Sequence, residues 1–164
     1  CRRNGDDPAK LPKRYADTIN AALKDRPAGM TVTMHTCRGN FKSAWVAEGG
    51  YDPVAEAMFS ANVDGFFMEF DSARAGSFEP LRALPKGKKV VLGLVTTKVG
   101  QIEDKAMLKR RIGEAAKFVP LENLCLSPQC GFSSTHHGNA LSHEDQWRKL
   151  ALIVEVARDV WGQA

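Results

Sequence analysis

The segment Lys89-Val90-Val91-Leu92-Gly93-Leu94-Val95 is the most strand-like part of this 164-residue sequence. It is a short apolar run with three valines, and the turn residues Pro85-Lys86-Gly87 introduce it. A run of this length beside turn signals predicts a strand that is buried on both faces, as in a parallel sheet. Because parallel strands need long crossovers, we expect the rest of the chain to alternate between strands and amphipathic helices.

The flanking sequence has this alternation. Short apolar or β-branched runs predict further strands at residues 31–37, 65–70 and 124–127. Apolar residues at helical spacing, with proline and capping signals near the ends, predict helices at about 8–25, 52–62, 103–118 and 142–161, and residues 78–84 form a loop or short helix. The predicted apolar face of the last helix consists of Trp147, Leu150, Ile153, Val154 and Val160.

The predicted order α, β, α, β, β, α, β, α indicates an α/β fold, with a parallel sheet covered by helices. The four predicted strands are about half of a (β/α)8 barrel, whose usual length is ~250 residues or more. A doubly wound open sheet is the alternative, although no Gly-rich phosphate loop follows the first strand. The chain begins at Cys1 without an initiator Met, so we expect it to start inside a longer protein.

The composition is that of a soluble globular domain, with 43% hydrophobic and 26% charged residues and a net charge of +4. No apolar run approaches the ~18–20 residues that span a membrane. Lys105, Lys109, Arg110 and Arg111 lie at helical spacing, and we favour a solvated helix face over a phosphate or polyglutamate contact. We expect a cytoplasmic protein that binds neither membrane nor nucleic acid.

Four cysteines could form two disulfides in a secreted protein. No signal peptide is present, and three of the cysteines lie in or beside predicted strands. Reduced thiols are therefore favoured, which points to metal binding or catalysis. Cys125 lies inside an apolar strand and is expected in the core, and Cys1 has no assigned role.

Three predicted strand ends supply side chains that zinc accepts. His35 and Cys37 lie two residues apart at the end of the first strand, so their side chains share a face. Glu69 lies at the end of the second strand, and Cys130 follows the fourth. Active groups gather at the carboxyl ends of parallel strands, so these side chains should lie close together. The residues alone leave two interpretations open, a metal site and ordinary packing.

Several motifs in this region resemble those of the cobalamin-independent methionine synthase family, in particular the short bacterial members that consist of the catalytic barrel. They run in order through most of the chain: His35-Thr36-Cys37, Met68-Glu69 with Ser72 and Arg74 behind it, Leu94 to Lys98, and Pro128-Gln129-Cys130-Gly131. The resemblance implies that His35, Cys37, Glu69 and Cys130 hold one catalytic zinc ion.

The resemblance also implies a fold, a reaction and partners. Residues 1–164 would be the C-terminal half of the catalytic barrel, completed by a missing N-terminal half or by a second copy. The enzyme would transfer a methyl group to homocysteine, with 5-methyltetrahydrofolate or its polyglutamate as the donor. A thiol attacks well only as a thiolate, and two thiolates with a carboxylate make the zinc electron-rich, which favours a nucleophilic sulfur over water activation. Glu69 is the expected exchangeable ligand, because sulfur holds zinc more firmly.

This sequence departs from the family pattern after the segment 89–95. Longer members carry a His-containing motif there for proton transfer, whereas this chain reads Thr96-Thr97-Lys98-Val99-Gly100. Lys98 is therefore a candidate substitute in catalysis. His136 and His137 lie on the loop after Cys130 and are either substrate-binding residues or exposed loop histidines.

Two alternatives to the leading hypothesis remain. One keeps the zinc and the chemistry but uses another thiol or a corrinoid-protein methyl donor. The other is a non-catalytic zinc-binding fragment, which is disfavoured because closed structural sites usually contain CxxC pairs and this chain has none.

Overall fold

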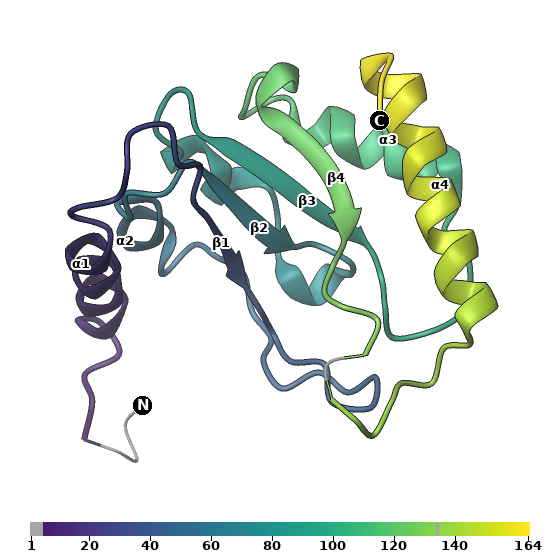
Figure 1. The fold of residues 1–164 in the computed structure, drawn as a ribbon, viewed down its shortest axis with the longest axis horizontal. Coiled ribbons are helices and arrows are strands. Elements are labelled where there is room, and N and C mark those ends of the chain that lie inside the picture. Colours follow the sequence, from purple (N-terminus) through teal and green to yellow (C-terminus); the bar gives the residue numbers. More distant parts are fainter. Residues whose placement is uncertain (1–4, 134) are drawn as a thin grey trace.

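The computed structural model describes residues 5–133 and 135–164, and Cys1 lies outside the described residues. The order of the main elements is the predicted one (Figure 1). The strands are β1 (Thr33–Thr36), β2 (Gly65–Glu69), β3 (Lys89–Val95) and β4 (Leu124–Pro128). The α-helices are α1 (Leu11–Ala22), α2 (Ala55–Phe59), α3 (Lys105–Ala115) and α4 (His143–Trp161), and short 3-10 helices are η2 (Ala73–Ala75), η3 (Glu79–Ala83) and η4 (Leu121–Asn123).

The four strands form one parallel sheet in the order β1-β2-β3-β4. Glu69 at the end of β2 lies opposite Gly93 of β3, so the carboxyl ends of the strands meet at one edge. Each strand adds to the same side of the preceding strand, as in a (β/α)8 barrel, whereas a doubly wound sheet reverses its order at a switch point. The predicted α/β fold with parallel strands is confirmed, and its strand order is that of half a barrel.

The two faces of the sheet have different surroundings. Alternate residues of the central strands, among them Phe66 and Leu92, are 0% exposed and form one apolar core with residues of the helices, such as Val156. The residues between them point to the other face, where His35 and Cys125 are exposed. The prediction that Cys125 lies in the core is wrong, because an apolar run such as 124–127 does not tell which of its alternating positions faces the helices.

The buried face of α4 also differs from the prediction. Trp147 and Val154 are 68% and 39% exposed, whereas Leu152 and Val156 are buried. Lys149 is 0% exposed at the N-terminal end of this face, where its Nζ atom lies 3.0 Å from Glu103 Oε2. The predicted face was wrong partly because it left out Lys149. A rule that places only apolar residues inside does not anticipate a buried lysine in an ion pair.

The first two helices, α1 and α2, are shorter than predicted at both ends. α2 begins at Ala55 rather than at residue 52, and Asp52 does not cap it. Tyr51 is buried, and its carbonyl accepts a hydrogen bond from the Val54 amide at 3.0 Å, so residues 51–54 form a turn instead.

Part of the basic cluster on α3 joins that helix to its neighbours. The Nζ atoms of Lys105 and Lys109 lie 2.8 and 2.5 Å from Asp159 Oδ2 on α4. Arg111 donates to the carbonyl of Phe70, beyond the end of β2, at 2.5 Å. These three cations therefore connect elements within the chain, and the preference for a solvated helix face over a phosphate or polyglutamate contact stays a prediction.

Both edge strands of the described sheet have a neighbour on one side only, since β1 pairs with β2 and β4 pairs with β3. In Figure 1, α1 stands beyond β1 at one side, and α3 and α4 lie at the β4 side. None of the helices in the described part of the chain combines the length and the apolar character needed to cross a membrane.

Candidate metal centre

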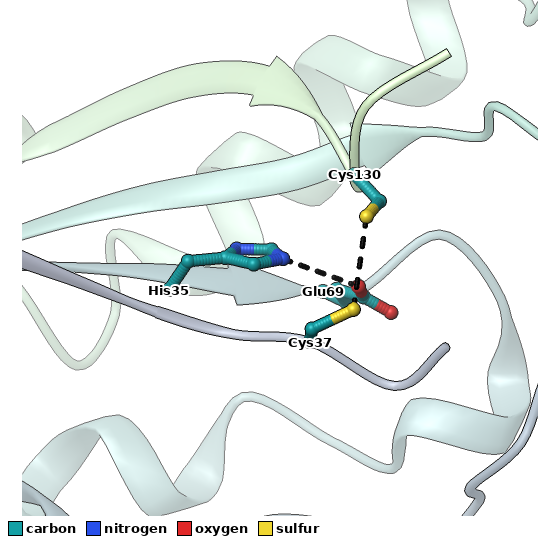
Figure 2. Close-up of side chains that lie close together, drawn as sticks. All are labelled: His35, Cys37, Glu69 and Cys130. Carbon is teal, nitrogen blue, oxygen red and sulfur yellow. Dashed lines mark hydrogen bonds and ion pairs between the residues drawn. The ribbon is translucent and has the colours of Figure 1, made fainter. Parts of the chain in front are cut away.

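Four side chains from three strand ends converge at the carboxyl edge of the sheet (Figure 2). They are His35, Cys37, Glu69 and Cys130, and one potential ligand atom of each lies within 4.8 Å of the others. The Nε2 atom of His35 is 3.5 Å from Oε1 of Glu69, and the Sγ atoms of the two cysteines are 3.7 Å apart. The fold thus brings together all four residues that were proposed as ligands from the sequence.

β1 and the turn after it place His35 and Cys37. His35 lies in the strand on the uncovered face, and Cys37 is the first residue beyond the strand. The Gly39 amide donates to Cys37 Sγ at 3.3 Å. Gly39 has a φ of 95°, and a Cβ there would lie 2.5 Å from the side chain of Val46, so this turn requires glycine.

The buried Tyr51 side chain holds the backbone of Glu69. Its hydroxyl accepts a hydrogen bond from the Glu69 amide at 2.9 Å and donates to the Glu69 carbonyl at 3.3 Å. Tyr51 is 4% exposed, and the guanidinium of Arg38 lies 4.3 Å from the centre of its ring. The end of β2 is therefore fixed by a side chain whose role the sequence did not indicate.

A glycine in β3 permits the close approach of Cys130. Gly93 lies between the ends of β2 and β4, and a Cβ at this position would be 2.8 Å from the Cα atom of Gln129 and 2.9 Å from the Met68 carbonyl oxygen. The pairing of β3 with β4 also shifts register between Gly93 and Val95. The missing side chain and the irregularity together allow the segment with Gln129 and Cys130 to cross close to Glu69.

The ionisable groups of the cluster stabilise one another's charges. Interactions with the Cys130 thiolate, and then with the Glu69 carboxylate, raise the pKa of His35 to about 10. The same interaction with His35 lowers the pKa of the Cys130 thiol, although burial opposes this. Burial has the largest single influence on Glu69 and opposes its ionisation, but the interactions with His35, the Arg38 backbone and Gln129 together outweigh it, so the pKa of Glu69 lies below its usual value. The arrangement favours two anionic groups around a position for positive charge.

The cluster fits a bound cation. Glu69 is 0% exposed, and its carboxylate oxygens have no hydrogen-bond partner, only contacts at 3.5 Å with the charged groups of His35 and Arg74. Leaving such a group unsatisfied costs about 1–3 kcal/mol, and more when it is charged. A metal ion among the four side chains would take a Glu69 oxygen as a ligand, and imidazole, thiolate and carboxylate are all metal ligands. These residues could therefore bind a metal ion.

Lys98 lies close to this cluster but is directed toward the loop that follows β1. It is 2% exposed, and its Nζ atom donates to Gly39 O at 2.5 Å, to Asn40 Oδ1 at 2.8 Å and to Ala44 O at 3.3 Å. Burial lowers its pKa, although Cys130 and Glu69 oppose the shift. All three ammonium hydrogens have acceptors within the protein.

His136 and His137 are exposed and lie outside the group of possible ligands that the described residues form. Their rings are 3.8 Å apart, and the His137 ring packs edge-on against Phe41 with a centroid distance of 5.2 Å. His137 thus contacts the loop after β1, and His136 packs against His137.

Arg74 and Asn40 are also part of the surroundings of the cluster. The Nη2 atom of Arg74 lies 3.5 Å from Glu69 Oε2, and its Nη1 atom donates to the carbonyl of Ala47 at 2.6 Å. Asn40 is 6% exposed and donates to the carbonyl of Gly131, next to Cys130. The motif Met68-Glu69 had drawn attention to Arg74, but no sequence signal marked Asn40, because its contacts lie far away in the chain.

Residues 16–159 match the sequence profile of the family described as "Cobalamin-independent synthase, Catalytic domain". The chain belongs to this family. Two relatives of this chain are the uncharacterized proteins YxjH and YxjG of Bacillus subtilis (strain 168), each 54% identical to it. The alignments cover 98% and 96% of this chain but only 43% and 42% of the relatives, so the chain spans less than half the length of the relatives it matches.

Two solved structures also resemble this chain over most of its length and over less than half of their own. A Listeria monocytogenes protein provisionally assigned as a vitamin-B12-independent methionine synthase superposes with a TM-score of 0.74 and 42% identity, over 97% of this chain and 44% of that chain. A B12-independent methionine synthase from Shewanella sp. W3-18-1, solved with selenomethionine, gives 0.68 with 22% identity, over 91% of this chain and 46% of that chain. The predicted family and the half-barrel fold are thus confirmed.

Proposed function

We propose that this synthase domain holds a catalytic zinc ion and transfers a methyl group to the thiol of homocysteine, which produces methionine. The observation that carries the proposal is the convergence of His35, Cys37, Glu69 and Cys130 at the carboxyl edge of the sheet. Membership in the cobalamin-independent synthase family supports this class of reaction. The uncovered face of the sheet adds a groove of about 440 Å³ beside His35 and Cys130, which leaves room for a substrate.

Zinc is the metal that suits these donors best, because thiolates and imidazole bind it well and are poor ligands for Mg²⁺ and Ca²⁺. When bound, zinc supplies the Lewis acidity that keeps a substrate thiol deprotonated at neutral pH. Cys37, Cys130 and Glu69 would contribute three negative charges against the two positive charges of the metal. The donor set therefore favours a nucleophilic sulfur over the activation of water.

Glu69 is the side chain that we expect to make way for the substrate thiol. Its carboxylate is a harder ligand than the sulfurs of Cys37 and Cys130, so it is held less firmly by zinc. Arg74 lies 3.5 Å from Glu69 Oε2 and would pair with the carboxylate as it moves. The two cysteines and His35 would remain in place.

The rest of a barrel would complete the site. Residues 1–164 are proposed to be the second half of a catalytic barrel, with an N-terminal half or a second copy as its partner. Three observations support this: the free edges of β1 and β4, the exposed inner face, and a mostly apolar groove of about 690 Å³ between α1, β1 and α2. Exposed apolar edges favour further pairing, so a partner that covers them would stabilise the domain.

The full-length protein that carries this domain provides the test. We expect about one zinc ion per domain and the formation of methionine from homocysteine with 5-methyltetrahydrofolate or its polyglutamate as the methyl donor. Parallel assays with other thiols and with a methylated corrinoid protein distinguish the close alternatives. Protein that lacks zinc would contradict the metal site, and zinc-loaded protein that methylates no thiol would contradict the enzymatic proposal.

A further inference from the structure

The buried ammonium of Lys98 connects the end of β3 to the turn that carries Cys37. Its acceptors are two backbone carbonyls, those of Gly39 and Ala44, and the side-chain oxygen of Asn40. An ammonium group has three hydrogens to donate, and these three acceptors use all of them. In this arrangement Lys98 fixes the path of the backbone two residues beyond Cys37.

Asn40 extends this connection to the second cysteine. Its side-chain oxygen accepts from Lys98 at 2.8 Å, and its side-chain amide donates to the carbonyl of Gly131. Gly131 directly follows Cys130 in the sequence. The chain of contacts Lys98–Asn40–Gly131 therefore joins the ends of β3, β1 and β4, and its side chains, Lys98 and Asn40, are only 2% and 6% exposed.

We propose that Lys98 and Asn40 are positioning residues that hold Cys37 and Cys130 side by side. The proposal rests on the proposed function in one respect, since it takes the two cysteines to be metal ligands. The sulfur atoms of the two cysteines are 3.7 Å apart, although the loops that carry them are far apart in the sequence. Holding two ligands in the bound arrangement beforehand removes the cost of ordering them when the metal binds. Positioning is a role different from the proton handling that the sequence indicated for Lys98, which stays a prediction.

Other contacts keep the loop folded when this one is removed. Arg74 donates to Ala47 O at 2.6 Å, and its guanidinium lies 4.9 Å from the centre of the Trp45 ring. Arg38 also donates to the carbonyl of Gly49. The far end of the loop therefore has its own attachments, and loss of Lys98 should loosen the part next to Cys37 selectively.

The disulfide equilibrium of the metal-free full-length protein measures how well the two thiols are positioned. Protein depleted of metal with a chelator is equilibrated with oxidised and reduced glutathione. Cys37 and Cys130 lose two electrons and two protons to form one disulfide, and one oxidised glutathione becomes two reduced molecules. Peptide mapping quantifies the Cys37–Cys130 disulfide. Because no metal is present, this measurement does not depend on the proposed function.

Lys98→Met and Asn40→Asp are the informative variants. Lys98→Met removes the donor, whereas Asn40→Asp keeps an acceptor for Lys98 but removes the donor to Gly131. Lys88→Met is the matched control, because Lys88 donates to the carbonyls of Phe59 and Ala61 near the opposite end of β3. Both test variants should lower the disulfide equilibrium constant by about tenfold and the zinc affinity by about 10–100-fold, and the control should change neither.

An equilibrium constant in Lys98→Met equal to that of the wild type would overturn the proposal, as would an equal decrease in Lys88→Met. If Lys98→Met does not fold, Asn40→Asp decides by the same criterion, because its side chain has nearly the same size as the original. A wild-type protein that binds no zinc, but shows the expected disulfide constants, would disprove the proposed function and leave the positioning role intact.

Discussion

At the amino ends of the strands the buried and half-buried polar groups have partners, whereas at the carboxyl ends several have none. Asp64, just before β2, forms an ion pair with Arg26 at 2.8 Å and accepts a hydrogen bond from the Val32 amide at 2.8 Å. Lys88, just before β3, donates to two backbone carbonyls. These contacts pair the charged groups of Asp64 and Lys88 with partners at the amino end of the sheet.

Among the described residues, five buried side-chain nitrogen and oxygen atoms have no hydrogen-bond partner, and all five lie at the carboxyl end of the sheet. They are both carboxylate oxygens of Glu69, Ser72 Oγ, Arg74 Nε and Gln129 Nε2. A folded protein keeps few such groups, because each costs about 1–3 kcal/mol. The difference between the two ends teaches that polar groups at the amino end are paired within the fold, and that the unpaired polar atoms gather at the carboxyl end, where we propose that a metal ion binds.

The largest expected effect is on zinc binding, and it should differ between substitutions of two cysteines on the uncovered face of the sheet. Cys130→Ser should weaken zinc binding by more than about a hundredfold, since loss of a ligand should exceed the 10–100-fold effect of an outer partner. Cys125→Ser is the control, because Cys125 is exposed and belongs to β4 but not to the cluster. Metal analysis after dialysis against a competing chelator gives the comparison. Full zinc content in Cys130→Ser would remove Cys130 from the site.

Replacing each of two glycines by alanine tests whether the carboxyl end of the sheet depends on the close approach of neighbouring backbone segments. Gly93→Ala should destabilise the full-length protein by about 1–3 kcal/mol, because the added Cβ forces the backbones of Met68 and Gln129 apart. Gly113→Ala in α3 meets no atom within 4 Å and should stabilise by about 0.5–1 kcal/mol. Chemical denaturation measures both. A Gly93→Ala variant as stable as the wild type would show that the crossing segment shifts without cost.

The pH dependence of stability should differ in sign between the two ends. The pKa of His35 is raised from 6.5 to about 10 in the folded protein. Its contribution to the stability of metal-free protein is therefore fully present below about pH 6.5 and is lost as the pH rises through about 10. The wild type should lose stability relative to His35→Gln over this range. Parallel stability curves for the two proteins would contradict the interaction of His35 with Cys130.

The smallest effect is expected at the amino end, and it should leave the metal unchanged. The hydrogen bond and ion pair with Arg26 lower the pKa of Asp64, so its stabilising contribution is present above pH 3.8 and is lost as the pH falls through the lower folded pKa. Asp64→Asn should lower the urea midpoint at neutral pH and retain full zinc content. Asp17→Asn, which breaks an exposed pair with Lys13 on α1, is the control. Zinc loss in Asp64→Asn would mean that the two ends are coupled.

The sequence by itself determined the order of the elements and the four side chains of the cluster. Strand-length apolar runs such as 89–95 mark parallel strands by composition, which is a local property. The positions of His35, Cys37, Glu69 and Cys130 at strand ends were sufficient to place them at one edge, because parallel strands align their carboxyl ends. Local rules therefore placed the four side chains at one edge, whereas the choice of half a barrel and of a metal site came from the resemblance to the synthase family.

Only the tertiary structure decided which residues each element buries and which side chains from other elements contact them. The exposure of Cys125 and the burial of Lys149 depend on which face each element turns to the core, and a partner such as Glu103 lies 46 residues away in the sequence. Likewise, the contact of Asn40 with Gly131 joins residues 91 positions apart. Sequence patterns report periodicity within one element, whereas hydrogen bonds and ion pairs between elements arise when the chain closes around them. That is why the ligands could be read from the sequence and the residues that hold them in position could not.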